Sequence, residues 1–184
     1  MIGLERAGEH GLVVVERAVD RAEFQRVYYQ TWPDVFRYAW LLTRHRQDAE
    51  DVASEGFRRA LEAWCSGHGP RGEILPWLFT ITRRIAVDRH RRGRLFGWLP
   101  LERTPEPQTT GAEAEFRRSE FWIWFGQLSS VLSERQREAL LLRFQFDLSD
   151  AEAARVMGTS VGNVRTLVSR GLTTLRGRPE VMER

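Results

Sequence analysis

The 184-residue sequence contains no lysine, and all 28 of its basic residues are arginines. The planar guanidinium group offers a fork of N–H donors that suits phosphate groups and guanine edges, so arginine is compatible with nucleic-acid binding. An excess of arginine over lysine also follows from a GC-rich genome, and the formal net charge is only +3. The positions of the arginines therefore say more about function than their number does.

Cysteine and long apolar runs are also scarce. Cys65 is the single cysteine, which excludes an internal disulfide and favours a cytoplasmic location. The longest apolar runs fall well short of the roughly 18 residues of a membrane span, so we expect no membrane insertion. The apolar patch from Leu12 to Val15 is too short for a signal peptide. Strand-like alternation and internal repeats are absent, so we predict an all-α fold.

Helical periodicity divides the chain into two small helical domains joined by a flexible linker. Residues 1–17 lack clear periodicity, and we expect them to form a flexible N-terminal extension. The first domain is predicted over residues 18–93 and contains four helices. The expected helices start near Val19, at Pro33, at Asp48 as N-cap, and near Glu73, and the last two end near Trp64 and Arg92.

Turn-forming residues dominate the next segment. Pro100, Pro105, Pro107 and Gly111 predict an interdomain linker over residues 94–112. About 20 extended residues reach at most roughly 70 Å, and two helical turns of DNA span about the same distance. Two domains on such a linker can therefore hold two neighbouring DNA elements at once.

A second helical domain is predicted over residues 113–178, followed by a tail over 179–184. Its consecutive apolar residues 121–125 are typical of a buried helix, in which Trp122 and Trp124 fit either a core or an interface. Two capping-box patterns, in which a serine precedes Gln or Glu by three residues, mark helix starts at Ser133 and Ser149. These helices are expected to end near Phe144 and Met157.

Residues 149–176 have the pattern of a helix-turn-helix. Gly158 fits a left-handed turn after a short helix, and Ser160 can cap the longer helix that follows. The inward stripe of that helix consists of Val161, Val164, Val168, Leu172 and Leu175. Its outward face, where a recognition helix meets bases and phosphates, carries Asn163, Arg165, Thr166, Ser169 and Arg170. The same pattern also fits an ordinary helical hairpin with a solvated polar face.

The fourth helix of the first domain interleaves aromatic and basic residues. Single-stranded DNA is bound by aromatic rings that stack on bases and by cations that face the backbone. The residues that fit this chemistry are Trp77, Arg83, Arg84 and Arg91. A solvated basic helix with core aromatics is the alternative. The third helix begins with Asp48, Glu50 and Asp51, which suit either the helix dipole or a basic partner.

Four stretches in this order resemble the extracytoplasmic-function (ECF) sigma factors of the sigma-70 family. They are DAEDVASEGFRRALEAW (48–64), PWLFTITRRIAVDRHRR (76–92), LSERQREALLLRF (132–144) and LSDAEAARVMGTSVGNVRTLVSRGLTTLR (148–176). The resemblance implies a factor that brings core RNA polymerase to promoters and helps to melt the −10 element. It also implies control by a separate anti-sigma factor.

The resemblance assigns roles to particular positions. Docking on the clamp helices of the largest polymerase subunit falls to Asp48, Asp51, Glu55 and Phe57. Contacts to the −10 element fall to Arg83, Arg84, Asp88 and Arg91, and the loop over residues 66–72 helps to capture a flipped base. Contacts to the −35 element fall to Arg165, Thr166, Ser169 and Arg170. The second domain is expected to contact the flap of the second polymerase subunit.

The sequence departs from the family pattern at several positions. Ser54 stands where glutamine is common, Arg84 where asparagine is frequent, and Leu167 and Gly171 dilute the usual basic run of the recognition helix.

Two rival functions are weighed against this one. A stand-alone helix-turn-helix regulator would bind duplex DNA as a dimer without polymerase. A metal-dependent nuclease would use Asp48, Glu50 and Asp51, but only Asp48 and Asp51 share a helix face. We therefore expect no catalytic residues, no metal and no cofactor.

Overall fold

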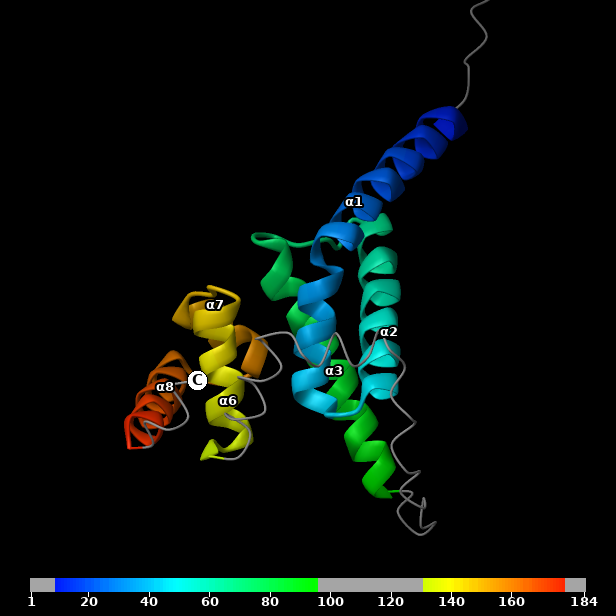
Figure 1. Cartoon of the computed structure of the whole chain (residues 1–184). Helices are drawn as coiled ribbons and strands as arrows, with labels where there is room; N and C mark the ends of the chain where they lie inside the picture. Colours follow the sequence, from blue (N-terminus) through cyan, green and yellow to red (C-terminus); the bar gives the residue numbers. More distant parts are fainter. Residues whose placement is uncertain (1–8, 96–130, 178–184) are drawn as a thin grey trace, which may run out of the picture. The chain divides into compact units, whose positions relative to one another are not determined.

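The computed structural model describes residues 9–95 and 131–177, and every regular element in these two ranges is helical. The chain divides into two compact units, Met1–Asp88 and Arg89–Arg184 (Figure 1). The all-α prediction is confirmed. The expected linker beyond residue 95, the Trp122 and Trp124 cluster and the tail over 179–184 lie outside the described residues. The exact domain limits therefore stay predictions.

The first unit opens with one long helix, α1, over Glu9–Thr43. Two predictions are wrong here. Residues 9–17 are helical rather than a flexible extension, whereas residues 1–8 lie outside the described part of the chain. Pro33 also lies inside α1 instead of starting a new helix.

The position of Pro33 on the exposed side of α1 explains why the helix continues through it. Proline lacks the N–H that would bond the carbonyl of Tyr29, but that carbonyl belongs to an exposed residue and can bond water. Buried residues on both sides of Pro33, among them Val27 and Val35, share one face of the helix. Tertiary packing of that face thus outweighs the local cost of the proline.

Helix α2 spans Arg46–Cys65 and helix α3 spans Ile74–Leu95. Asp48 was expected to cap α2, but the N-cap is His45, and Asp48 lies in the first turn. Arg44, with a left-handed φ of 56°, turns the chain before that point, so α2 begins three residues earlier than expected. Pro76 lies in the first turn of α3, where the missing N–H of proline costs no helix hydrogen bond.

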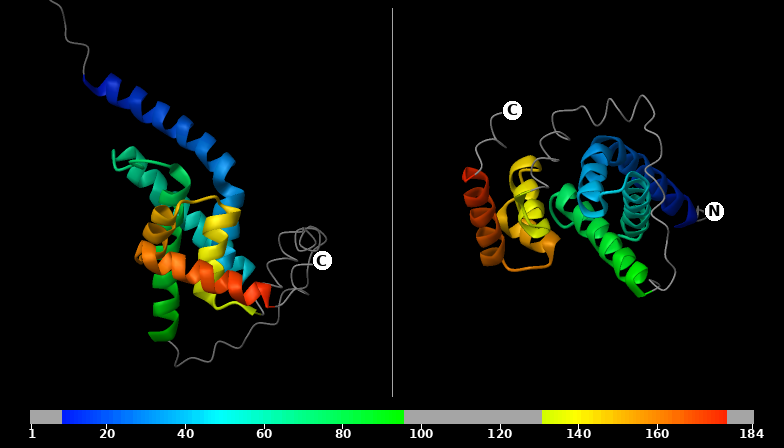
Figure 2. Two further views of the ribbon diagram at one scale, coloured as in Figure 1. Left: turned by 90° about the vertical axis from the view of Figure 1, so that its left-hand side faces the viewer. Right: turned by 60° about the horizontal axis from the view of Figure 1, so that its bottom comes forward.

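The three helices lie side by side in two views (Figures 1 and 2). The rings of Tyr38 in α1 and Phe79 in α3 are 4.5 Å apart between centroids, and both are fully buried. Helices α2 and α3 meet at Gly56, where an added Cβ would lie 3.0 Å from the Oγ1 atom of Thr82. The absence of a side chain at Gly56 therefore permits the close approach of the two helices.

The second unit contains α6 (Glu134–Leu140), the π-helical turn η1 (Leu141–Gln145), α7 (Asp150–Met157) and α8 (Val161–Arg176). Both predicted capping boxes are present, at Ser133 with Gln136 and at Ser149 with Glu152. Gly158 has a φ of 59° and ends α7 in the left-handed region, and the Ser160 side chain caps α8. The helix-turn-helix geometry predicted from these signals is confirmed.

Candidate nucleic-acid and polymerase interfaces

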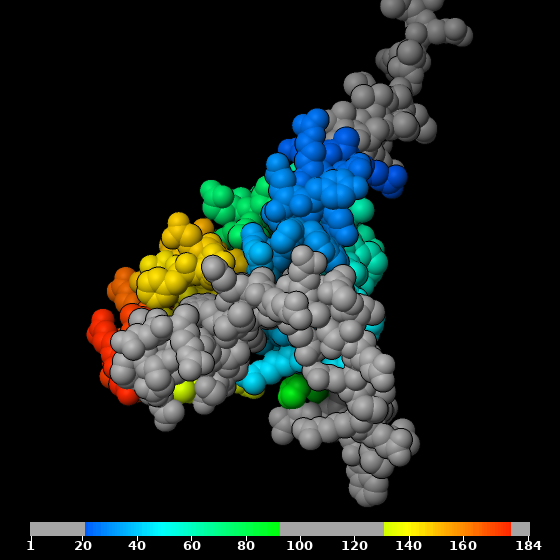
Figure 3. All heavy atoms as spheres, in the orientation of Figure 1, coloured from blue at the N-terminus to red at the C-terminus, as the bar shows by residue number. Residues whose placement is uncertain are grey.

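Helix α8 presents a polar face to solvent and an apolar face to its own unit. Val164 and Leu175 of the predicted stripe are buried, and Val168 and Leu172 pack against the cluster of Leu132, Leu140 and Leu175. The predicted base-reading residues Arg165, Thr166, Ser169 and Arg170 are all exposed. The space-filling view shows part of α8, in orange to red, at the surface (Figure 3). This face can approach a DNA groove without rearrangement of the unit.

Asn163 differs from the other four predicted base-reading residues. Its side chain is half-buried, and its Nδ2 donates to the Oγ1 atom of Thr159 at 2.9 Å. The backbone N–H of Asn163 donates to the Oγ atom of Ser160. Asn163 therefore ties the start of α8 to the turn, and its amide is already engaged in the free protein.

Arg165 is held by a residue that the sequence analysis did not single out. Its Nε atom donates to Oδ2 of Asp150 at 2.9 Å, and the other carboxylate oxygen, Oδ1, lies 2.7 Å from Nε of Arg143. The hydrogen bond from Arg165, with Arg143 beside it, holds the pKa of the Asp150 carboxyl below its usual value. Asp150 and Arg165 are 15 residues apart, so no local sequence pattern links them.

The second half of α3 carries an exposed charged face. Arg84, Asp88 and Arg91 follow one another at helical spacing and are all exposed. Arg83 is half-buried, and so is Trp77, whose ring centroid lies 6.3 Å from that of Trp64 in α2. Of the predicted −10 residues, the structure thus brings three together on one exposed face and sets Arg83 and Trp77 deeper.

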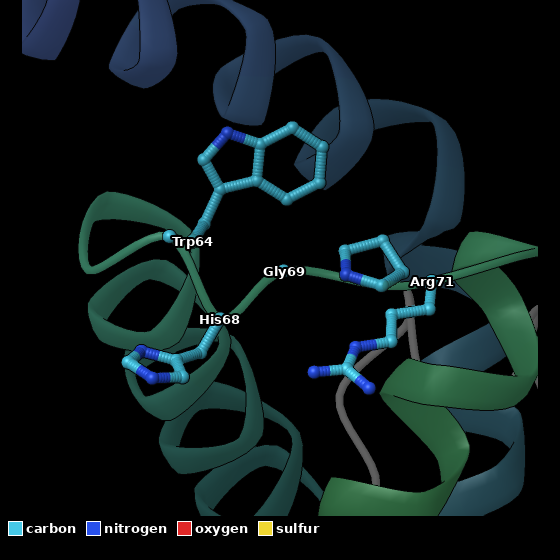
Figure 4. A pocket seen from close by; sticks show the side chains of 6 residues that line it. Trp64, His68, Gly69 and Arg71 are labelled. Atoms are coloured by element: carbon cyan, nitrogen blue, oxygen red, sulfur yellow. The ribbon is translucent and has the colours of Figure 1, made fainter.

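A pocket of about 440 Å³ lies in the loop between α2 and α3. It is lined by Trp64, Gly67, His68, Gly69, Pro70 and Arg71. The close-up shows the Trp64 indole and the side chains of His68 and Arg71 around the loop backbone (Figure 4). Such a pocket offers a ring for stacking, an imidazole and a guanidinium group, and its volume lies in the range of small-ligand sites.

The pocket coincides with the loop that the resemblance assigns to a flipped base. Sequence reasoning placed Trp64 only at the end of a helix and gave it no role. The signal that could have found it is an aromatic residue directly before a glycine-rich loop that also contains a cation.

The predicted polymerase-docking residues are divided by the structure. Asp48 and Asp51 lie at the solvent-facing start of α2. The carboxylate of Glu55 is engaged within its own helix, with Oε2 2.7 Å from Nε of Arg58 and Oε1 2.7 Å from Nε of Arg59. The hydrogen bond from Arg58, and then that from Arg59, lower the pKa of Glu55 to about 2. A partner that contacts Glu55 therefore meets a carboxylate that is already paired with Arg58 and Arg59.

Phe57 does not lie on the docking surface that the resemblance implied. Its side chain is only 4% exposed. Its ring centroid lies 4.8 Å from that of Tyr28 and 5.6 Å from that of Trp32, both in α1. Helical periodicity explains the correction, because Phe57 shares the buried stripe of α2 with Val52, Ala53, Gly56 and Ala60. We therefore assign Phe57 to the core.

The described residues contain no group of three or more His, Cys, Asp or Glu side chains arranged to hold a metal ion. The acidic start of α2 thus does not form the cluster that the nuclease alternative requires. In the same part of the chain, none of the helices has an apolar stretch long enough to cross a bilayer.

Comparison with known proteins matches two separate parts of the chain. Residues 28–95 match the family model for sigma-70 region 2, and residues 123–175 match that for sigma-70 region 4. The ECF RNA polymerase sigma factor SigC of Mycobacterium tuberculosis is 32% identical over 145 residues, which cover 79% of this chain and 77% of SigC. The chain belongs to the ECF sigma factors of the sigma-70 family.

This ECF sigma factor is also similar to two further proteins, one in sequence and one in fold. It is 33% identical over 172 residues to the ECF RNA polymerase sigma factor BldN of Streptomyces coelicolor. The match covers 88% of this chain but 63% of BldN, so the chain spans less than two thirds of the length of that relative. The sigma factor RpoE from Bartonella quintana, solved in complex with the anti-sigma factor NepR, shares the fold. It has a TM-score of 0.64 at 23% identity, over 88% of this chain and 97% of RpoE.

Proposed function

We propose that this ECF sigma factor directs core RNA polymerase to specific promoters and assists melting of the −10 element. It acts in the cytoplasm as a binding protein without catalytic chemistry of its own. One observation carries the proposal: two exposed arginine-bearing surfaces of different chemistry lie on two different helices, α3 and α8. The exposed face of α8 suits the major groove of duplex DNA, and the face of α3 suits unpaired strands.

At the −10 element, the α2–α3 loop pocket takes an extruded base. Unpairing and flipping a base costs a few kcal/mol, and stacking on an aromatic ring returns about 1–3 kcal/mol per base. In this proposal Trp64 supplies the stacking surface, His68 and Arg71 bind the base edge or its phosphate, and Arg84 and Arg91 hold the adjoining backbone. Asp88, exposed on the same helix face, completes the set of residues that the resemblance assigns to the −10 element.

Polymerase is engaged through the acidic start of α2. Asp48 and Asp51 dock on the clamp helices of the largest subunit, and the second unit contacts the flap of the second subunit. A separate anti-sigma factor restrains the free protein, as NepR binds the RpoE of Bartonella quintana. In this scheme each unit has one protein surface and one DNA surface, so polymerase can present both DNA surfaces to one promoter.

Run-off transcription with core polymerase and a library of upstream sequences tests the proposal. We expect transcripts only when the purified chain is added, from templates that share two elements at a fixed spacing. A gel shift without polymerase serves as the control. Tight binding to a two-fold symmetric duplex in that control, together with no gain in transcription, would instead identify a stand-alone helix-turn-helix regulator.

A further inference from the structure

The carboxylate of Asp150 lies at the junction of three elements in the second unit. Asp150 is the first residue of α7, Arg143 belongs to η1 and Arg165 to the second turn of α8. Oδ1 pairs with Arg143 at 2.7 Å and Oδ2 with Arg165 at 2.9 Å. Nη1 of Arg143 also donates to the carbonyl of Leu148. One carboxylate oxygen of Asp150 is thus held by Arg143, and the other contacts Arg165 of α8.

We propose that Asp150 is a positioning residue that orients the Arg165 guanidinium for base recognition in the −35 element. The inference rests on the proposed function, because it takes α8 as the recognition helix. Asp150 itself contacts no base. It acts by fixing the arginine that does.

The hydrogen-bond geometry leaves the useful edge of Arg165 available. Asp150 accepts from Nε, so the two terminal nitrogens, Nη1 and Nη2, remain for DNA. Paired guanidinium N–H groups match the O6 and N7 acceptors of guanine. The Arg165 side chain is 70% exposed, whereas those of Asp150 and Arg143 are 27% and 29% exposed. The outer arginine is therefore accessible while its support is partly sheltered.

Two physical effects of Asp150 both favour sequence discrimination. An arginine held in one orientation loses less side-chain freedom on binding than a mobile one. The carboxylate also offsets the charge of Arg165 and repels phosphates, which weakens contacts that any DNA sequence could make. Arg170 is also exposed on α8 and forms no ion pair among the described residues, so in this proposal its charge attracts phosphates of any sequence.

A double-mutant cycle on reconstituted holoenzyme tests this role. Four holoenzymes are compared: wild type, Asp150→Ala, Arg165→Ala and the double variant. Each is given the promoter together with a competing template in which one −35 base pair is replaced, and every −35 position is tested in turn. Discrimination is the ratio of binding to the two templates. We expect Arg165→Ala to relax discrimination at one or two adjacent base pairs by about tenfold, as for a lost bidentate contact. Asp150→Ala should relax it at the same positions by about fivefold, and the double variant should match Arg165→Ala.

Glu134→Ala provides a matched control. Like Asp150, Glu134 follows the serine of a capping box and is the first residue of its helix, α6. Glu134→Ala therefore removes a negative charge from a helix N-terminus, as Asp150→Ala does. We expect it to leave discrimination unchanged. Thermal unfolding of each variant checks folding, and Asp150→Asn, which keeps the side-chain shape, replaces the alanine variant if that variant unfolds.

Three outcomes would overturn the assignment. Asp150→Ala could leave discrimination unaffected, or it could reduce discrimination by the same factor in wild type and in the Arg165→Ala background. Arg165→Ala itself could fail to reduce discrimination at any particular base pair. Failure of the proposed function looks different, because wild-type holoenzyme would then show no promoter preference at all. A wild type that selects promoters without coupling between Asp150 and Arg165 overturns only the positioning role.

Discussion

Truncation of Phe57 to alanine will separate a core role from a docking role for this side chain. The buried Phe57 ring contacts aromatic rings of α1, with centroids 4.8 Å from Tyr28, 5.6 Å from Trp32 and 6.4 Å from Phe24. Removal of a buried phenylalanine ring typically costs about 3–5 kcal/mol. Since the free energy of unfolding of a whole domain is only about 5–15 kcal/mol, this loss would remove a large part of the stability of the first unit. Phe57→Leu keeps most of the volume and should cost about 1.5 kcal/mol or less.

Urea titration followed by far-UV circular dichroism measures these changes, and tryptophan fluorescence adds a local probe because Trp32 stacks on Phe57. Ser54→Ala, at an exposed position of the same helix, is the matched control and should stay within about 0.5 kcal/mol of wild type. Core polymerase binding is then measured under conditions in which each variant is folded. We expect folded Phe57→Leu to bind like wild type. An alanine variant that unfolds like wild type yet fails to bind polymerase would refute the core assignment and restore Phe57 to the docking surface.

Three further predictions concern the same unit. Gly56→Ala should destabilise the first unit, because overpacking against Thr82 costs about 1–3 kcal/mol. The gain in helix propensity, about 1 kcal/mol, offsets only part of this cost. The urea midpoint of Gly56→Ala should therefore recover in a Thr82→Ala background. The pKa of Glu55 is lowered from 4.5 to about 2, so its contribution to stability is complete above pH 4.5 and is lost as the pH falls toward 2. The difference in urea midpoint between wild type and Glu55→Gln should therefore shrink over that window, and high salt should reduce it at neutral pH. Arg84→Ala should impair strand opening, measured by permanganate reactivity of the −10 thymines, more than holoenzyme assembly; equal losses in both assays would contradict its place on the melting face.

Several helix ends in the second unit were predictable because their signals are local. A capping box is complete within four residues, and both Ser133 and Ser149 cap their helices as their sequences indicate. A left-handed glycine likewise needs no distant partner to end a helix, which explains the success at Gly158.

The course of α1 could not be predicted in the same way. The local preference of Pro33 for a first turn competes with a buried stripe that runs through it from Phe24 to Leu41. Whether a proline starts a helix or is accommodated within one depends on which face it occupies, and that face is set by packing against α2 and α3. Only the tertiary structure contains this information.

The site predictions divide along a related line. A match to a family motif assigns a role to a position but does not say whether its side chain reaches the surface. For Phe57, the spacing of Ala49, Val52, Ala53 and Gly56 in the same helix would have indicated burial. For Glu55, spacing to Arg58 and Arg59 at i+3 and i+4 likewise indicated an ion-pair network. Motif and periodicity therefore need to be applied together before a residue is assigned to an interface.

The role of Asp150 could not be predicted even from motif and periodicity together. The sequences Ser133-Glu134-Arg135-Gln136 and Ser149-Asp150-Ala151-Glu152 are parallel, and the helix dipole accounts for the acid at the second position of each equally well. Among the described residues Glu134 forms no ion pair, whereas Asp150 meets Arg165. The difference arises from the turn at Gly158, which returns α8 toward the start of α7 and brings two residues 15 positions apart into contact. A change in the length of that turn should therefore uncouple Arg165 from its support while both capping boxes remain intact.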